Sequence, residues 1–464
     1  GLAAAFAAIS GETQTGPNVF WILSCFNYAK VTGDVLWLRG YMPKLRRASA
    51  FLFDMLSPRL GLLHAPGSLM IDTFVRRNFT ADTNAMAVGF LREFAAAEHA
   101  VGNETGAVRL LAVARRVATS FDTLLWSTEA PDHYVSQLNP DGTTRDFVDY
   151  DSNLIALAHG IPPSRERALA ALRRIDQGRC SHGRATFVSE RWYGPLDTTS
   201  SNVGDSWCSM GRIGWFDALA RKRYGDLETF ASILDPLVAD INRWTWLYER
   251  YSCDGSPQTN RTAMYFEFPA VTAMMIHYIR YGLQLGFQTV TVTPFGPRDF
   301  SYHVGNMHLE FSPPERVALA VPGTGTRLII VEGLQDGAMY RFSMGSDDTT
   351  LEGRDGVTED AATTAGWPRA RCQQRIAGTT IASEGGRAEF QGPVGDASGP
   401  CIISVLRLSS DGPVFCLGSS CGQGSSSGSA LPPARRSQAP PLWQGAATAS
   451  HAEGGSRSLV RRGS

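Results

Sequence analysis

Three features that often reveal a protein's class are missing from this sequence: a long hydrophobic run, a strong net charge and closely paired cysteines. The apolar runs fall far short of the roughly 20 residues that span a bilayer, so no transmembrane helix is expected. The 43 lysines and arginines nearly balance 44 acidic residues, and the formal net charge of −1 gives no overall field that would attract nucleic acid or a membrane. The opening GLAAAFAAIS lacks Met and a basic segment, which indicates a fragment or trimmed product and not a signal peptide.

Motifs for metals, nucleotides and nucleophilic serines are also missing. The eight cysteines are dispersed without a CxxC pair, so a zinc site of standard spacing is not expected. There is no HExxH, no P-loop, no GxGxxG after a strand and no GxSxG elbow between a strand and a helix. A zincin, a nucleotide enzyme, a dehydrogenase and a serine hydrolase are therefore disfavoured, and neither a cofactor nor a metal is predicted.

What is present, from about residue 18 to 285, is a hydrophobic pattern with the period of a helix. Met86, Phe90 and Phe94, for example, recur on one helical stripe. About nine helices are predicted in pairs, separated by long polar loops at 58–79, 127–150 and 176–204. The predicted fold is mainly α, an (α/α)6 toroid that nine helices leave incomplete, since six closed hairpins need twelve. An open α-solenoid is the alternative.

The period changes after residue 286. The segments FQTVTVTPF, RVALAVPG, RLIIVEGL and IISVLRLS are rich in Val, Ile and Thr and are cut by Pro and Gly, as strands are. We therefore predict a toroid domain at 1–286 and a small β-sandwich domain at 287–409. Ser, Gly, Pro, Ala and Arg dominate residues 410–464 without periodicity, which predicts a disordered tail.

The stretch from Trp244 to Pro269 places Glu249 and Glu267 among aromatic residues. This combination suits a sugar, whose C–H faces are apolar and whose rim carries hydroxyls, so Trp244 and Trp246 are candidates for stacking. Glu267 is predicted at a helix start, where the dipole and free N–H groups explain a carboxylate. Glu249 is predicted at the negative, C-terminal end of its helix. Because nothing local favours a carboxylate there, a functional role is favoured.

Two of the predicted loops carry further acids. Asp72, in LMIDTFVRRNF, is a candidate ligand for sugar hydroxyls, whereas Asp82 is expected to cap a helix. In RDFVDYDSNLI, Asp149 and Asp151 are two residues apart and would point in different directions on a helix. Asp151 suits an N-cap, which leaves Asp149 to face a ligand. His159, on the apolar helix that follows, is expected to lie in the core.

A third loop, FVSERWYGPLDTTSS, places Glu190 shortly before Trp192 and Tyr193. Aromatic neighbours exclude water and raise the pKa of a carboxyl group, which suits a general acid. The alternative for Glu190 is a surface ion pair with the adjacent Arg191. Trp192 and Tyr193 are further candidates for stacking on a sugar.

These residues resemble the six-hairpin glycosidase superfamily, and most closely its α-L-rhamnosidases. In that family an aromatic-Glu-Arg-aromatic run, a loop and the last toroid helix precede a small β-sandwich. Tyr248-Glu249-Arg250-Tyr251 and the segment after it have this order, and the resemblance covers about residues 10–345. It implies that Glu249 is the general base. The family's acid-rich segment before the first toroid helix is not recognisable here, and only Glu12 lies near that place.

The combined prediction is an exo-acting glycoside hydrolase that cleaves a terminal sugar, an α-L-rhamnoside or similar, by an inverting two-carboxylate mechanism. Glu249 would take a proton from water, and Glu190 or Glu12 would protonate the leaving oxygen. The remaining acids would hold sugar hydroxyls: Asp72, Asp149 and Glu267. The rivals are a catalytically inactive carbohydrate-binding relic, a lyase or phosphorylase on the same toroid, and an α-solenoid scaffold.

Carbohydrate is the partner that this prediction requires, while neither nucleic acid nor a membrane is expected. The oligomeric state is left open by the sequence. Asn78-Phe-Thr, Asn103-Glu-Thr and Asn260-Arg-Thr are acceptors for N-glycosylation, and they support secretion only weakly because such triplets are frequent by chance.

Overall fold

The protein is described by a computed structural model that covers residues 13–178, 187–191, 207–258, 264–293 and 295, together with the strands between residues 300 and 407. The chain divides between residues 410 and 411, and every described residue belongs to the first unit. The tail predicted at 410–464 lies outside the described residues. Within the described ranges, no helix is long and apolar enough to cross a membrane.

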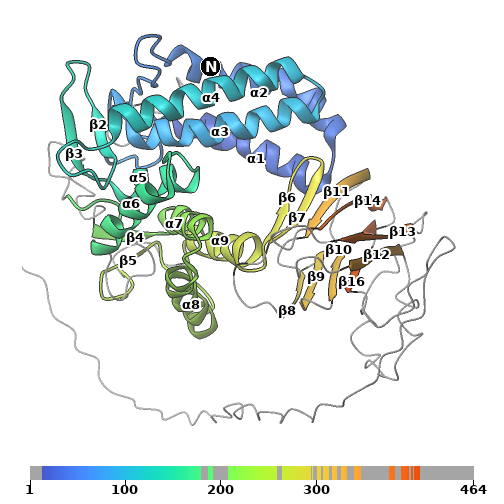
Figure 1. The fold of residues 1–464 in the computed structure, drawn as a ribbon. Helices are drawn as coiled ribbons and strands as arrows, with labels where there is room; N and C mark the ends of the chain where they lie inside the picture. The colour runs from blue at the N-terminus through green and yellow to red at the C-terminus, as the bar shows by residue number, and fades with distance from the viewer. Residues whose placement is uncertain are drawn as a thin grey trace, which may run out of the picture. The chain divides into compact units, whose positions relative to one another are not determined.

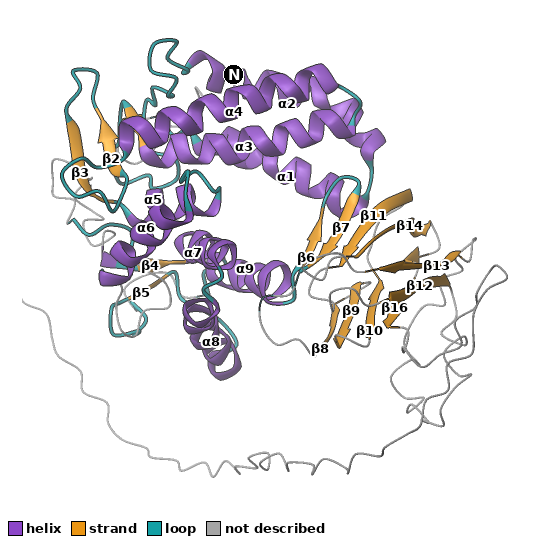
Figure 2. Ribbon diagram, viewed as in Figure 1, coloured by secondary structure: helices purple, strands orange, loops and turns teal. Residues whose placement is uncertain are grey.

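Helices dominate the first part of the chain (Figures 1 and 2), as the hydrophobic period predicted. In the described residues they are α1 (Gly16–Thr32), α2 (Val35–Asp54), α3 (Ala81–Ala100), α4 (Glu104–Leu125), α5 (Tyr150–Ala158), α6 (Arg165–Gln177), α7 (Gly211–Tyr224), α8 (Leu227–Trp244) and α9 (Glu267–Met274). The last continues as a π-helix, η3 (Met275–Arg280). Helix α7 follows the two-residue strand β4 (Ser209–Met210) directly.

Consecutive helices form hairpins, and the odd-numbered members form an inner layer. Contacts join α1 to α2, α3 to α4 and α7 to α8 within hairpins, and they join α1, α3, α5, α7 and α9 in succession. Burial separates the layers: sixteen of the 20 residues of α3 are buried, but only six of the 22 in α4. Long α3 and α4 run side by side in Figure 1. This two-layered arrangement of hairpins is consistent with a helical toroid.

The outer helix α4 has a single apolar stripe, whereas the inner helices α3 and α5 are buried nearly all round. In α4 the buried residues recur every three or four positions, so one face covers α3: Ala107, Leu110, Ala114, Val117, Phe121 and Leu125. By contrast, all nine residues of α5 are buried, since it is enclosed by its neighbours. The polar residues that α5 does contain therefore need partners inside the fold.

Part of one predicted loop is a β-hairpin. Within 127–150, β2 (Val135–Leu138) pairs antiparallel with β3 (Thr144–Val148), and β2 also pairs with β1 (Phe79–Thr80). The turn reads Asn-Pro-Asp-Gly, Gly142 has a φ of 89°, and the N–H of Asn139 donates to the carbonyl of Thr143. This turn chemistry is a sequence signal for a hairpin. The long polar loop predicted at 127–150 therefore contains a hairpin that the sequence analysis did not predict.

The four strand segments predicted after residue 286 are confirmed, and they belong to two sheets. The five-stranded sheet has the order β15 (Gly399–Pro400), β14 (Ala388–Asp396), β11 (Gly325–Val331), β7 (Thr289–Val292) and β6 (Leu283–Leu285). The six-stranded sheet has the order β13 (Ile376–Ile381), β12 (Met339–Gly345), β16 (Ile402–Arg407), β10 (Arg316–Ala320), β9 (Met307–Ser312) and β8 (Phe300–Val304). Pairing is antiparallel except between β7 and β11. Face-to-face packing of the sheets as a sandwich stays a prediction.

Candidate active site

The N-terminal ends of the inner helices are tied to one another, and we call this region the helix-start rim. It is defined by the five residues that cap these helices: Thr15, Thr80, Asp149, Met210 and Phe266. The hydroxyls of Thr15 and Thr83 are 2.8 Å apart, which joins the start of α1 to that of α3. At the other side, a Cβ on Gly211 would lie 3.1 Å from the backbone of Phe268, so the starts of α7 and α9 touch.

Short β-bridges connect the remaining helix starts. Thr80 pairs with Gln137 of the hairpin that leads into α5, and Asp149 pairs with Ser189. From there Phe187 pairs with Ser209, and Ser209 pairs with Tyr251 of β5 (Arg250–Tyr251). These pairings hold four segments at the starts of α3, α5 and α7: the hairpin of β2 and β3, residues 187–189, β4 and β5. The long loops thus carry their side chains to the helix-start rim.

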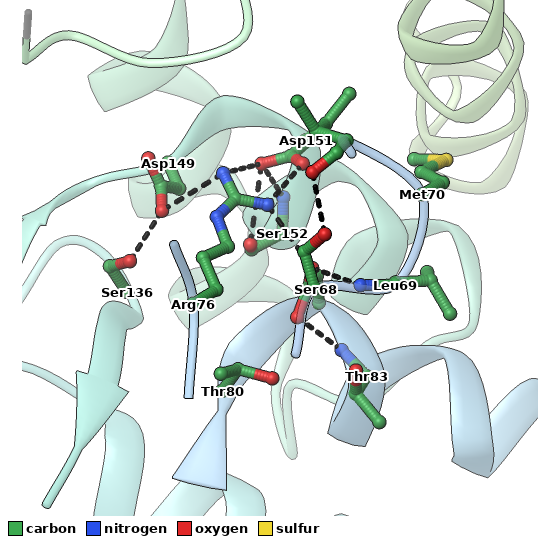
Figure 3. A network of polar contacts seen from close by, with 12 residues as sticks. Ser68, Leu69, Met70, Arg76, Thr80, Thr83, Ser136, Asp149, Asp151 and Ser152 are labelled. Atoms are coloured by element: carbon green, nitrogen blue, oxygen red, sulfur yellow. Dashed lines mark hydrogen bonds and ion pairs between the residues drawn. The ribbon is translucent and has the colours of Figure 1, made fainter. Parts of the chain in front are cut away.

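Arg76 is the centre of a buried polar cluster at this rim (Figure 3), with 1% of its side chain exposed. Its Nη1 donates to Oδ2 of Asp151 at 2.7 Å and to Oδ2 of Asp82 at 3.1 Å. Its Nη2 donates to Oδ1 of Asp151 at 3.0 Å and lies 3.1 Å from Oδ2 of Asp149. Asp149 also accepts a hydrogen bond from the hydroxyl of Ser136. The loop that carries Arg76 is thereby fixed to the starts of α3 and α5.

The structure corrects the roles predicted for the acids of this cluster. Asp149, and not Asp151, is the residue before the first turn of α5, and its φ of −85° and ψ of 108° are extended. Since Asp149 is outside the helix, the helical spacing argument does not apply, and both carboxylates reach Arg76. The N-cap of α3 is Thr80, so Asp82 is not the cap that the sequence predicted. It accepts the N–H of Leu69 at 2.9 Å and a bond from Arg76.

The charges of the cluster are unbalanced, because three buried carboxyl groups surround one guanidinium. The pKa of Asp151 is raised to about 6, because burial and the nearby charges of Asp149 and Asp82 raise it by more than Arg76 lowers it. Three ionised carboxylates in one buried site repel each other, so holding a proton is the cheaper arrangement. We therefore expect Asp151 to be the member of the cluster that takes up a proton as the pH falls towards 6.

Two helix starts share a signature that the sequence analysis missed. In ADTN and YDSN, an Asp, a hydroxyl residue and an Asn follow one another in the first turns of α3 and α5. The side-chain amide of Asn84 makes two hydrogen bonds to the backbone of Leu63: Oδ1 accepts its N–H at 2.7 Å, and Nδ2 donates to its carbonyl at 3.0 Å. Asn153 does the same to Tyr134, at 2.8 and 2.9 Å. The repeated D-[S/T]-N triplet was the signal that could have revealed these positions.

A second cluster lies at the starts of α7 and α9. Glu267 accepts the backbone N–H of Arg212 at 2.9 Å and its Nε at 3.0 Å, while Nη1 of Arg212 donates to the carbonyl of Met70 at 3.0 Å. Burial lowers the pKa of Arg212, but Glu267, Tyr265 and Asp72 raise it, and the net shift is upward. The predicted helix start at Glu267 is confirmed. Its carboxylate binds the first turn of the neighbouring inner helix, and Asp72 is close enough to act on the same guanidinium.

Glu249 is five residues beyond the end of its helix. Helix α8 ends at Trp244, and Thr245, with a φ of 63°, turns the chain away. The predicted position at the negative end of the helix is therefore wrong, and so is the electrostatic reason drawn from it. Glu249 directly precedes β5, in which Arg250 pairs with Met210 at the start of α7. Its side chain is 19% exposed, and Oε1 lies 3.3 Å from Nη2 of Arg250.

Glu190 is held by the chain on both of its carboxylate oxygens. Oε1 accepts the N–H of Val148 at 2.8 Å, and Oε2 accepts a bond from Arg174 of α6. The backbone N–H of Glu190 in turn donates to the carbonyl of Val148 at 3.0 Å. Arg174 also lies 3.9 Å from Asp132. Glu190 is thus fixed next to the start of α5, with 24% of its side chain exposed.

Solved structures resemble this arrangement, although no protein-family model and no curated protein matches the sequence. A structure described as a sialidase aligns with a TM-score of 0.50 and 13% identity, over 68% of this chain and 29% of its own. A GH78 family rhamnosidase of Bacillus sp. GL1 aligns at 0.48 and 17%, over 68% and 31%. A neutral trehalase of Saccharomyces cerevisiae aligns at 0.33 and 11%, over 42% and 37%.

At 13% identity, the likeness to the sialidase structure is a likeness of fold alone, and it agrees with the helical toroid that the sequence predicted. The two matches with a TM-score below 0.5 add nothing to this conclusion. The chain spans under a third of the length of the sialidase and of the rhamnosidase, so the activities of those whole proteins are not transferred by the match.

Two of the aromatic residues predicted to stack on a sugar are described. Trp244, the last residue of α8, is 46% exposed, and the guanidinium of Arg243 lies 4.4 Å from its ring centre. Trp246 packs against Tyr248, with ring centres 4.5 Å apart. Both stay candidates for stacking on a sugar. The other candidates lie outside the described residues: Trp192, Tyr193 and the acid Glu12.

Two of the glycosylation acceptors use their side-chain amides within the fold. Nδ2 of Asn78 donates to Asn139 at 3.0 Å, and Nδ2 of Asn103 donates to Glu98 at 2.8 Å. Asn103 is also the N-cap of α4. A glycan on either nitrogen would have to replace these hydrogen bonds. The third acceptor, Asn260, lies outside the described residues.

Proposed function

We propose that this protein is a glycoside hydrolase that removes a terminal sugar, an α-L-rhamnoside or a similar unit, with inversion at the anomeric carbon. The observation that carries the proposal is the gathering of acids from separate segments at the helix-start rim. Glu249 comes from the segment after α8, Glu267 from the start of α9, and Asp72 from the loop before α3. A sugar with several hydroxyls and one scissile bond needs such a set of acids around it.

Glu249 is the proposed general base. Its neighbour Arg250 pairs with Met210, the residue before α7, so Glu249 lies near the start of that helix. Nη2 of Arg250 is 3.3 Å from Oε1 of Glu249, which leaves the second carboxylate oxygen to approach a water. The side chain is partly exposed, so water can reach it. An ionised, accessible carboxylate is what a general base requires.

Glu190 is the proposed general acid, and this assignment sets a condition on its neighbours. An inverting pair needs carboxyl groups about 6.5–9.5 Å apart, so that substrate and water fit between them. A general acid must also reach the leaving oxygen, whereas both carboxylate oxygens of Glu190 already accept bonds, from Arg174 and from the N–H of Val148. Glu190 can therefore serve only if Arg174 moves towards Asp132 when substrate binds. If it does not, Glu12 is the alternative acid.

The remaining acids are proposed to position the sugar. Asp72 and Glu267 act on Arg212, and together they offer acceptors and a donor to sugar hydroxyls. Asp149 has no exposed surface, so we propose that it supports the rim through Arg76 instead of touching the sugar. For the fold, we propose that the helices form a closed ring of six hairpins and that the two sheets pack as a β-sandwich. The succession of inner helices and the two sheets support it.

A panel of nitrophenyl glycosides tests the proposal, with Glu249→Gln as the decisive variant. The amide keeps the shape of the side chain but cannot accept the proton, so turnover should fall about 10²–10⁴-fold, the usual scale of general-base loss. Glu129→Gln is the matched control, because Glu129 is an exposed glutamate in a loop. Thermal unfolding of both variants checks that the fold is intact. Full activity in Glu249→Gln would refute the assigned base.

A carbohydrate-binding protein without catalytic activity is the second candidate. The specific observation in its favour is that the carboxylates of both Glu190 and Glu267 already bind arginines of the chain. Calorimetric titration with free sugars distinguishes the two candidates. Micromolar to millimolar binding without release of nitrophenol, on a protein with a normal thermal midpoint, would favour the binding function.

A further inference from the structure

We infer that His133 is a pH-sensitive switch that decides whether Arg174 holds Glu190 or moves to Asp132. A protonated His133 keeps Arg174 on Glu190, and the loss of one ring proton releases it. Because Glu190 is the proposed general acid, the switch rests on the proposed function, but the contacts that form it need no substrate. It would regulate when Glu190 becomes available to a sugar.

Four side chains form a continuous chain of contacts beside the start of α5. Nδ1 of His133 lies 2.8 Å from Oδ1 of Asp132, and the same oxygen lies 3.9 Å from Nε of Arg174. Nη2 of Arg174 donates to Oε2 of Glu190. A single oxygen of Asp132 is thus shared between the imidazole and the guanidinium. A change of charge at His133 therefore acts directly on the group that holds Glu190.

Both ring nitrogens of His133 face carboxylates, and its side chain is only 5% exposed. Nε2 lies 2.8 Å from Oδ1 of Asp146, the same distance that separates Nδ1 from Asp132. A neutral imidazole has one N–H donor and an imidazolium has two, whereas an ionised carboxylate only accepts. Only the imidazolium satisfies both contacts with ionised carboxylates. The arrangement therefore favours the charged form of His133.

When the pH rises, His133 loses the proton on Nδ1 and keeps the one on Nε2. Asp146 is only 17% exposed, and its other oxygen accepts the hydroxyl of Ser127 at 2.7 Å. Asp132 is 40% exposed, so water can replace the lost hydrogen bond there and carry the proton away. An unpaired carboxylate costs more free energy when it is buried than when it is in water. Asp132 is therefore the acid that loses its partner.

Arg174 responds because it lies between two acids. While the imidazolium balances the charge of Asp132, Glu190 attracts the guanidinium more strongly. Once that charge is unbalanced, Coulomb attraction across 3.9 Å draws Nε of Arg174 towards Asp132. The side chain of Arg174 is 27% exposed, which leaves it room to turn. Glu190 then keeps the N–H of Val148 on Oε1, and its Oε2 becomes available.

The neighbouring titratable groups keep their charge over the range in which a histidine titrates. Tyr150 senses the charges of Glu190 and Arg174, but burial raises its pKa to about 12, so its hydroxyl stays neutral below pH 9. Arg167 of α6 already pairs with Asp122 of α4 at 2.6 Å. The other arginines nearby are charged throughout this range: Arg145 on β3 and Arg191, which packs on the ring of Phe147. The titration at this place therefore belongs to the imidazole.

NMR of the full chain with ¹⁵N-labelled histidine and arginine tests the switch without any substrate. The His133 ring should carry two N–H protons at pH 5 and keep only the one on Nε2 as the pH rises, and the Nε signal of Arg174 should shift over the same range. His133→Gln places an amide nitrogen towards Asp146 and gives Asp132 no donor, so the Arg174 signal should already be at its high-pH position at pH 5. A ring with one proton at pH 5, or an Arg174 signal that ignores the titration of His133, would overturn the inference.

Two further variants separate the switch from a merely structural role. His99→Gln is the matched control, because His99 is an exposed histidine that also contacts a carboxylate, Glu104, and it should leave the pH dependence of the Arg174 signal unchanged. Asp132→Asn removes the competing charge, so that signal should stay at its low-pH position up to pH 8; a shift equal to that of the parent would refute the role of Asp132. A protein without hydrolase activity would still give these signals. An active hydrolase in which Arg174 stays in place would refute the switch and leave Glu12 as the acid.

Discussion

At the scale of single residues, Arg76 shows how one side chain can organise a whole region. It lies in a loop, yet it reaches acids that are six, 73 and 75 positions away along the chain, Asp82, Asp149 and Asp151. All of these groups are buried, and buried charges are tolerated only when paired and hydrogen-bonded. The cluster therefore fixes where the Asp72-bearing loop runs across the helix-start rim, and with it any site built there.

The excess of acid around Arg76 predicts a pH-dependent stability. The folded pKa of Asp151, about 6, exceeds its unfolded value near 3.8, so the native state holds a proton more tightly. The resulting stabilisation is complete below the unfolded pKa and is lost as the pH rises through 6. Asp151→Asn mimics the protonated form at every pH, so the variant does not lose this stabilisation as the pH rises. Relative to the parent, the variant should gain about 1 kcal/mol in unfolding free energy between pH 5 and 7.5.

Urea unfolding at both pH values measures this difference. Arg76 keeps two acidic partners in Asp151→Asn, so the variant should fold. Glu129→Gln, which changes an exposed carboxyl, should show no such pH dependence. A constant difference between Asp151→Asn and the parent at pH 5 and 7.5 would show that Asp151 is ionised throughout.

At the scale of elements, α3 and α5 begin in the same way. In both, an Asn in the first turn binds the N–H and the carbonyl of one residue on the preceding segment, and donates to the carbonyl of the N-cap. The two amides thus replace backbone hydrogen bonds for Leu63 and Tyr134, which are themselves buried. The duplicated device holds the entry to each inner helix at a fixed angle.

Removing either amide should therefore cost a similar amount of stability. Asn84→Ala and Asn153→Ala each strand a buried backbone N–H, and one unsatisfied group costs about 1–3 kcal/mol. Asn242→Ala on the exposed surface of α8 is the control and should change the unfolding free energy by less than about 0.5 kcal/mol. Chemical denaturation of the three variants makes the comparison. If only one of the two buried sites were sensitive, the helix starts would not be equivalent.

At the scale of the whole molecule, the C-terminal segment is predicted to be dispensable. The composition of residues 411–464 offers too little apolar surface to offset the entropy of ordering. A chain that ends at residue 410, where the contacts divide, should therefore keep its thermal midpoint within about a degree. Differential scanning calorimetry of the shortened and full chains tests this. A drop of several degrees would mean that the segment packs against the rest.

Local sequence patterns predicted most helices and strands correctly, but they failed where one element ends and the next begins. The helical period placed α3 and α4 and the Val- and Thr-rich runs placed β7 and β11, because burial of one face imposes a period on the sequence. The end of α8 was misjudged because WTWLYER has no Gly or Pro, and a left-handed Thr245 ends the helix there. Such a turn depends on what the following strand pairs with, which is β4, about 40 residues earlier.

The hairpins, the strands that follow them and the helix start at Glu267 follow from the sequence alone. The folded arrangement, by contrast, decides which acids are already bound to arginines. Asp149, Asp82 and Asp151 share Arg76, and Arg174 binds Glu190, whereas Glu249 keeps partial exposure beside α7. The physical reason is that a helix records its own burial in its period, but a carboxylate carries no trace of the distant arginine that will neutralise it.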